Sequence, residues 1–217
     1  MRNWILTLGL IVSTTLSLEA RHQEEIVDFD VPVASFKSSE AGYVSPDAVR
    51  TGYLSVVGMQ LTGFDGEKGE KMEAAFKALE EVVNSEEFKD RVINFKNTNG
   101  ERSFASNKGL SNEEIYAIFM EGREKLQPET PGEMNFYLRL YNKPWSKVIG
   151  YTTSKINLIN INWKYFKNNP VASVAANLAH EWTHKIGFDH RSAKEHDSAP
   201  YAIGYIVGDL IRQKGLQ

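Results

Sequence analysis

The amino-acid sequence predicts an α+β fold, in which a β-sheet packs against helices. Apolar residues recur every three or four positions in three parts of the chain, near residues 67–83, 111–126 and 170–186. This spacing is typical of amphipathic helices. Strand-like runs lie between the second and the third of these helices, at residues 134–141, 148–153 and 156–162. Together these two observations predict helices that cover a sheet.

The first two helices are predicted from periodicity and from capping signals. Residues 67–83 place four apolar side chains on one face: Met72, Phe76, Leu79 and Val83. Ser111 and Glu114 have the spacing of a capping box, so a second helix begins there and ends before Pro128. Between the two helices, Ser85 predicts a short helical turn. The apolar residues at 92–95 then predict the beginning of a strand.

The third helix is predicted to run from Pro170 to about Ile186, with Asn169 as its cap. Four apolar side chains fall within about 40° of one line along it: Val171, Val174, Leu178 and Trp182. His180 and His184 fall roughly 200–240° away from that line. We therefore expect the helix to bury one face in the core and to direct its two histidines into a cavity.

Composition sets broad bounds on what the chain does. Its 217 residues suffice for one domain with a real core, and 41% hydrophobic and 24% charged residues are ordinary for a globular protein. A net charge of −3 and the absence of a basic tract give no indication of a nucleic-acid partner. The chain has no cysteine, which excludes disulfides, a lipoprotein anchor and a thiol-based latency switch.

The N-terminus has the pattern of a secretory signal peptide. A positive start at Arg2 precedes an apolar run from Trp4 to Leu18, and Ala20 offers a small residue for cleavage. We therefore divide the chain into a signal peptide at 1–20, a segment at 21–62 without strong periodicity, and a domain at 63–217. The middle segment is open to three interpretations: a loose leader, a short pro-segment, or strands and turns wrapped on the domain. A secreted or periplasmic bacterial location fits a disulfide-free exported chain, with no stable membrane insertion after cleavage.

The residues with the most chemical information are 180–190, HEWTHKIGFDH, which hold three of the five histidines. His180 and His184 are four apart, so both imidazoles project from one helical face and can reach one metal ion. Gly187 follows where the helix must end and reverse, a position that favours a residue without Cβ. His190 then lies on the returning segment. Three neutral nitrogen ligands leave the fourth position of a tetrahedral zinc ion for water, which indicates a catalytic site.

These residues spell HExxHxxGxxH in full, and the chain thereby resembles the metzincin zinc peptidases. The resemblance implies a zincin-like catalytic domain with a small twisted mixed β-sheet and an active-site helix at about 170–187. It implies one catalytic zinc ion held by His180, His184 and His190, with Glu181 as general base and acid in peptide hydrolysis. It also implies an antiparallel upper strand that binds an extended peptide or protein substrate, for which residues 148–153 are the candidate.

The chain departs from the family pattern beneath the metal. Metzincins carry a methionine in a tight turn after the third histidine, but the last methionine here is Met134. Residues 198–204 lie at a suitable distance and have turn chemistry, so we expect them to take the packing role. Tyr201 or Tyr205 either reaches the transition state or forms the floor of the pocket. His196 and Asp197 are read as a surface pair, with His196 as a metal ligand or supporting group the lesser alternative.

Other functions share parts of this pattern. A zinc-binding module of a secreted protein that is not a peptidase would need the histidines but not Glu181. A zinc amidase that acts on cell-wall peptides would use the same chemistry on another substrate. The sequence leaves the natural substrate, the metzincin subfamily and the oligomeric state open.

Overall fold

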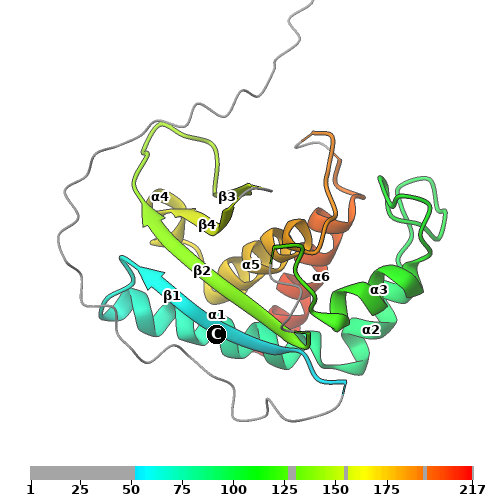
Figure 1. Cartoon of the computed structure of the whole chain (residues 1–217), viewed down its shortest axis with the longest axis horizontal. Helices are drawn as coiled ribbons and strands as arrows, with labels where there is room; N and C mark the ends of the chain where they lie inside the picture. The colour runs from blue at the N-terminus through cyan, green and yellow to red at the C-terminus, as the bar shows by residue number, and fades with distance from the viewer. Residues whose placement is uncertain (1–51, 127–130, 154–155, 193–194, 217) are drawn as a thin grey trace, which may run out of the picture. The chain divides into compact units, whose positions relative to one another are not determined.

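The structure, a computed structural model, describes residues 52–126, 131–153, 156–192 and 195–216 (Figure 1). The chain divides into two units, Met1–Ala34 and Ser35–Gln217, and all described residues belong to the second. The predicted signal peptide and residues 21–51 lie outside the described residues. Among the described residues, no helix combines the length and the apolar character needed to cross a membrane.

Four strands form one mixed sheet in the order β1-β2-β4-β3. Their bounds are Ser55–Thr62 for β1, Glu133–Tyr141 for β2, Gly150–Thr153 for β3 and Ile156–Asn162 for β4. β1, β2 and β4 run parallel, and β3 lies antiparallel to β4 at the edge of the sheet. The three strands expected from the sequence are confirmed, with β3 beginning two residues later than its apolar run. The small mixed sheet with helices also confirms the predicted class in its general form.

β1 was not predicted individually, although strands wrapped on the domain were one of three interpretations for residues 21–62. It lies within the segment 21–62, and its residues pair in register with β2 from Ser55 opposite Glu133. The sheet therefore begins before residue 63, where the predicted domain starts. The alternation of apolar and polar side chains expected of a strand is broken in β1 by Gly58 and by a shift in register between Gly58 and Gln60. Gly58 is needed there, because a Cβ would lie 2.9 Å from the Phe76 ring of the first helix.

Six helices complete the described fold. They are α1 at Glu67–Val83, α2 at Glu86–Ile93, α3 at Asn112–Glu121, α4 at Trp163–Phe166, α5 at Val171–Lys185 and α6 at Ala199–Lys214. α1 has the predicted bounds, and the capping box of Ser111 and Glu114 is formed at the start of α3. α5 matches the predicted third helix to within one residue at each end, with Val174, Leu178 and Trp182 buried as expected.

Several local predictions are wrong. Residues 92 and 93 end the helix α2, because Val92 packs into the core as part of its apolar face. α3 ends at Glu121, five residues short of the predicted 126, because Gly122 takes a left-handed conformation as its C-cap and a side chain there would meet the backbone of Glu133 at 2.9 Å. Pro170, not Asn169, is the N-cap residue of α5. Residues 198–204 form no turn, because α6 begins at Ala199 with Ser198 in the N-cap position.

The core lies between the sheet and the helices α1 and α5. Phe136 of β2 stacks on Phe76 of α1, with ring centroids 5.5 Å apart, and contacts Trp182 of α5 at 6.0 Å. Both helices therefore pack on the same face of the sheet. α6 packs on α5 through small residues, since a Cβ at Gly204 would lie 2.9 Å from the Ala176 carbonyl oxygen. This close approach brings the first turn of α6 against the histidine-bearing face of α5.

A buried ion pair ties the end of α5 to the sheet. Lys185 Nζ lies 3.0 Å from Glu124 Oε2, and the two side chains are only 5% and 1% exposed. The ammonium also donates to the Asn135 carbonyl of β2. Burial raises the pKa of Glu124 and lowers the pKa of Lys185, while their mutual attraction opposes both shifts. The pair thus holds together two charges that would be costly apart.

We predict that Glu124→Gln lowers the free energy of unfolding by about 3 kcal/mol, because it leaves the Lys185 ammonium buried without its counter-charge. Chemical denaturation of the full chain measures this loss. A double variant, Glu124→Leu with Lys185→Met, should regain much of it, since neither charge is then buried. A double variant no more stable than Glu124→Gln would contradict this account of the pair.

Candidate metal centre

The end of α5 and the turn after it bring three histidines together. His180 and His184 lie one turn apart on α5, and the helix ends with Ile186 as its C-cap. Gly187 has a φ of 106°, which favours glycine. The Gly187 amide donates to the His184 carbonyl at 3.0 Å and the Phe188 amide to the Thr183 carbonyl at 2.9 Å. This Schellman motif reverses the chain and returns His190 to the helix face.

The ligand atoms of His180, His184 and His190 all lie within 4.8 Å of one another, so the three could hold a metal ion. Their ring centroids are 5.0 to 5.3 Å apart. His180 Nε2 and His184 Nε2 are separated by 3.2 Å. Two ligands of a tetrahedral zinc ion with bonds of about 2.0 Å stand roughly 3.3 Å apart, so this pair fits such an ion.

The hydrogen bonds of the two helical histidines select the tautomer that binds a metal. His184 Nδ1 donates to the Phe188 carbonyl at 2.8 Å, which leaves Nε2 unprotonated in the neutral ring. His180 is hydrogen-bonded to the backbone of Pro200, which has only a carbonyl to offer. The His184 Nε2 atom therefore presents a lone pair, 3.2 Å from His180 Nε2. Such second bonds to carbonyl groups are typical of histidines that hold metals.

Electrostatics also keeps the three rings neutral. Burial lowers the pKa of His180 to about 3, and repulsion from His184 and His190 adds to the effect. Burial likewise lowers the pKa of His184 and of His190, although nearby carboxylates oppose the shift at His190. Since a metal must compete with protons for imidazole nitrogen, rings that stay neutral are suited to bind one.

Glu181 lies beside this cluster and is only 3% exposed. Burial raises the pKa of Tyr201, and the charges of Tyr205 and Glu181 add to that shift. Burial raises the pKa of Tyr141 to about 12, again with a contribution from Glu181. The carboxylate thus lies within electrostatic range of both tyrosines, one at the end of β2 and one at the start of α6. Glu181 is thus a buried carboxylate next to His180 in the sequence, with an electrostatic influence on Tyr201, which packs on the histidines.

Tyr201 packs directly on the histidines. Its ring centroid lies 4.6 Å from that of His180 and 4.7 Å from that of His190. Tyr205, one turn further along α6, is half exposed and stacks on Tyr201 at 6.2 Å. Of the two predicted tyrosines, Tyr201 contacts the cluster and Tyr205 lies at its margin. α6 supplies this contact from its first turn, where the sequence predicted a non-helical turn.

His196 and Asp197 have separate partners. His196 Nδ1 lies 3.0 Å from the Tyr205 hydroxyl, so the structure places this ring with Tyr205 and not among the three clustered histidines. Asp197 Oδ2 accepts from the amide and the hydroxyl of Thr98, at 3.0 and 2.7 Å. Its carbonyl accepts from the Ala105 amide at 2.8 Å. Asp197 therefore fastens the segment after His190 to the loop between α2 and α3.

The same loop also holds Gly187 and Glu195, on either side of His190, through two contacts that were not predicted from the sequence. Ser106 Oγ donates to Glu195 Oε1 at 2.8 Å, and Lys108 Nζ donates to the Gly187 carbonyl. Ser106 and Lys108 are the non-glycine residues with positive φ among those described, at 55° and 58°. Backbone of this kind is sparsely populated and persists where other contacts hold it. These contacts join residues 79 to 89 positions apart, so no local pattern reveals them.

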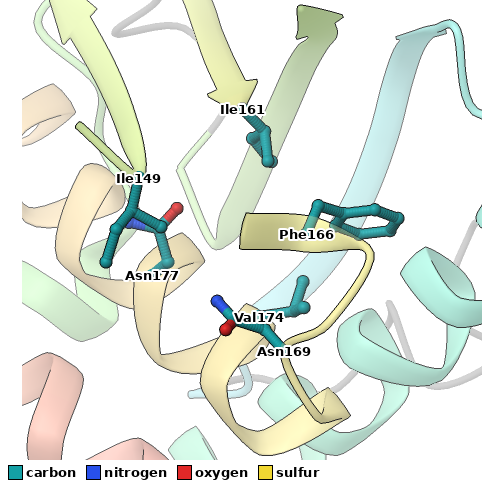
Figure 2. Close-up of a pocket in the computed structure, with 6 residues that line it drawn as sticks. All are labelled: Ile149, Ile161, Phe166, Asn169, Val174 and Asn177. Carbon is teal, nitrogen blue, oxygen red and sulfur yellow. The ribbon is translucent and has the colours of Figure 1, made fainter. Parts of the chain in front are cut away.

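A small hollow lies beside the site, between α4, the first half of α5 and the β3 end of the sheet (Figure 2). It is a shallow, partly open hollow with a cavity volume of about 10 Å³, lined by Ile149, Ile161, Phe166, Asn169, Val174 and Asn177. Asn177 stands one turn before Glu181, and a Cβ on Gly150 would lie 2.7 Å from Asn177 Oδ1. This glycine therefore lets β3 approach α5 closely, next to the catalytic candidate.

Comparison of the chain with models of known protein families, with curated proteins and with solved structures finds no match. Function must therefore be argued from the residues of the site.

We predict that the full chain, freed of metal by a chelator, binds one zinc ion. His184→Ala should weaken this binding by more than about 100-fold, since changes to groups that merely support a ligand already cost 10- to 100-fold. Competition with a zinc-sensitive dye measures the affinity.

His196→Ala is the matched control, because it removes a histidine of the same region that is bonded to Tyr205. It should bind zinc as the wild type does. Equal losses in both variants would show that the three clustered histidines are not the ligands.

Proposed function

We propose that this chain is a zinc-dependent peptidase of metzincin type that hydrolyses peptide bonds outside the cytoplasm. The observation that carries the proposal is the meeting of three neutral imidazoles with a buried glutamate beside them. Three nitrogen ligands and an open fourth position are typical of catalytic zinc sites, whereas structural sites fill all four positions. The predicted signal peptide at 1–20 supports the location.

His180, His184 and His190 would hold the ion. Imidazole nitrogen is a common ligand of zinc, and the 3.2 Å separation of the two helical Nε2 atoms fits a tetrahedral zinc ion. Zinc bound there supplies Lewis-acid chemistry, which polarises a carbonyl group and lowers the pKa of water toward about 7. The carbonyl groups of Phe188 and Pro200 orient the two helical rings for this role.

Glu181 would move the proton. Its carboxylate takes a proton from the attacking water while the water oxygen bonds to the carbonyl carbon of the scissile amide. When the carbon–nitrogen bond breaks, the same proton passes to the leaving amine, so the carboxylate ends as it began. Burial at 3% exposure keeps bulk water away from this exchange. A closed structural metal site has no use for a carboxylate here, and this favours the hydrolase over a zinc-binding module.

β3 would align the substrate. It is an antiparallel edge strand that precedes the last strand before the site helix, and the metzincin resemblance implies such a strand. An edge strand offers backbone groups with which an extended peptide can pair by strand addition. Gly150 places the start of β3 against Asn177 of α5, one turn before Glu181. A peptide bound along β3 would therefore lie beside the carboxylate.

Tyr201 would replace the methionine that metzincins place beneath the metal. Its ring contacts two of the three ligands, as a floor must. Burial raises the pKa of its phenol, so the hydroxyl keeps its proton at neutral pH and is able to donate a hydrogen bond. The same side chain thus supports both roles considered for it, packing beneath the ligands and stabilising the negative oxygen of the intermediate.

We predict that Glu181→Gln lowers kcat/KM for peptide cleavage by 10²- to 10⁴-fold, the usual contribution of a general base, and leaves one zinc ion bound per chain. Cleavage of casein and of a mixed peptide library by the zinc-loaded full chain measures the activity. Glu113→Gln, on the exposed side of α3, is the control and should cleave as the wild type does.

Full activity in Glu181→Gln would contradict the proposed mechanism. A wild-type chain that binds zinc but cleaves no peptide would favour the zinc-binding module. Cleavage confined to cell-wall peptides would identify the amidase.

A further inference from the structure

The loop between β2 and β3, residues 142–149, carries an unusual concentration of exposed apolar side chains. Trp145 is 94% exposed, and Val148 and Ile149 are 44% and 42% exposed. Large hydrophobic side chains are exposed at only three other places among the described residues: Met59, Leu126 and Tyr205. Figure 1 shows this loop extending beyond the ends of β2 and β3. Exposed apolar groups gathered in this way indicate a contact surface.

Several hydrogen bonds from side chains of β4 and α4 hold the loop. Asn162, which is fully buried, donates through Nδ2 to the carbonyls of Lys143 and Val148, at 3.1 and 3.2 Å. Its Oδ1 accepts from the Lys143 amide at 3.3 Å. The Ser146 carbonyl accepts from Lys164 Nζ at 3.0 Å and from the Tyr165 hydroxyl at 3.1 Å. These hydrogen bonds on both sides of Trp145 hold the loop in the conformation that exposes its side chain.

The same bonds distinguish between two kinds of partner. The Ser146 amide donates to the Lys143 carbonyl, the Val148 amide to Ser146 Oγ, and the Ile149 carbonyl accepts from the Asn162 amide. Much of the loop backbone is thus already satisfied within the protein. A segment that enters a lipid interface must bring its backbone hydrogen bonds with it, whereas a peptide that pairs by strand addition needs open ones. This pattern favours lipid as the occupant.

Charge points to the same kind of surface. Six lysines or arginines and no aspartate or glutamate lie between Glu133 and Glu181, in a chain whose net charge is −3. Lys143 and Lys147 flank Trp145 and are both exposed. Tryptophan prefers the boundary between headgroups and acyl chains, and basic residues next to it are attracted to anionic headgroups. The acidic residues that make the chain negative overall therefore lie outside residues 134–180.

We propose that residues 142–149 dock this protein peripherally on a membrane surface of anionic phospholipid, with the Trp145 ring in the headgroup region and Lys143 and Lys147 beside the phosphates. The loop begins after Tyr141 and ends before Tyr151, whose rings are 5.7 Å apart. Docking itself is independent of the proposed peptidase activity. That activity, where it holds, would be directed at peptides near the membrane.

The test measures the tryptophan emission of the full chain carrying Trp4→Phe. Without Trp4, insertion of the apolar residues 4–18 into a membrane does not itself change a tryptophan signal. Vesicles of phosphatidylglycerol and brominated phosphatidylcholine in equal parts should shift the emission to the blue and quench it. Vesicles of brominated phosphatidylcholine alone should do neither. Trp145→Ala in the same background should abolish the response, since Trp182 is buried and Trp163 packs on Phe166.

Charge reversal with a matched control tests the lysines. Lys143→Glu with Lys147→Glu should raise the anionic lipid needed for half-maximal quenching at least about 20-fold, given roughly fivefold for each basic residue at such a surface. Lys77→Glu with Lys89→Glu is the control. It changes the net charge by the same amount, on the exposed faces of α1 and α2, and should raise the anionic lipid needed for half-maximal quenching less than about threefold.

Several results would overturn the proposal. One is a Trp145 emission that anionic vesicles leave unchanged. Another is equal weakening by the two pairs of lysine changes. A third is a Trp145→Ala variant with the wild-type response to vesicles and a raised KM for a soluble peptide, which would make the loop a substrate contact.

Discussion

The reversal of the chain at Gly187 is the constraint on which the candidate metal centre depends. A helix can direct only two of the three histidines to one point, so the third must return within a few residues. Gly187 allows this with a positive φ of 106°, a backbone conformation that L side chains rarely adopt. Lys108 binds the Gly187 carbonyl from the α2–α3 loop, and the buried pair of Lys185 and Glu124 holds the helix end two residues earlier. The turn is thus supported from both sides.

The two sides of α5 have different roles. Val174, Leu178 and Trp182 fix it in the core, and the opposite side meets α6 through glycines and carries His180 and His184. Because α6 approaches so closely, the Tyr201 ring in its first turn packs on His180 and His190. If the chain is a metzincin, as we propose, this ring takes the place of the missing methionine.

Local patterns in the sequence predicted much of this arrangement. The bounds of α1 and α5, the capping box of α3 and the positions of the three histidines follow from spacing alone, since each depends on residues within one or two turns. β1 escaped prediction because Gly58 and a bulge interrupt its alternation. The helical start of α6 was missed because Ser198 and Pro200 suit a turn as well as a helix N-terminus. Ser106, Lys108 and Glu124 act across long stretches of chain, and no local signal reports such contacts.

X-ray absorption at the zinc edge, on the full chain loaded with one equivalent of zinc, reports directly on the ligands of the ion. We expect a four-coordinate ion with three imidazole nitrogens at about 2.0–2.1 Å and one further light ligand from solvent. The same measurement on His190→Ala should show one imidazole fewer, because the ligand delivered by the Gly187 turn is gone. A zinc ion surrounded by six oxygens, or one with four protein ligands and no solvent position, would rule out the proposed catalytic centre.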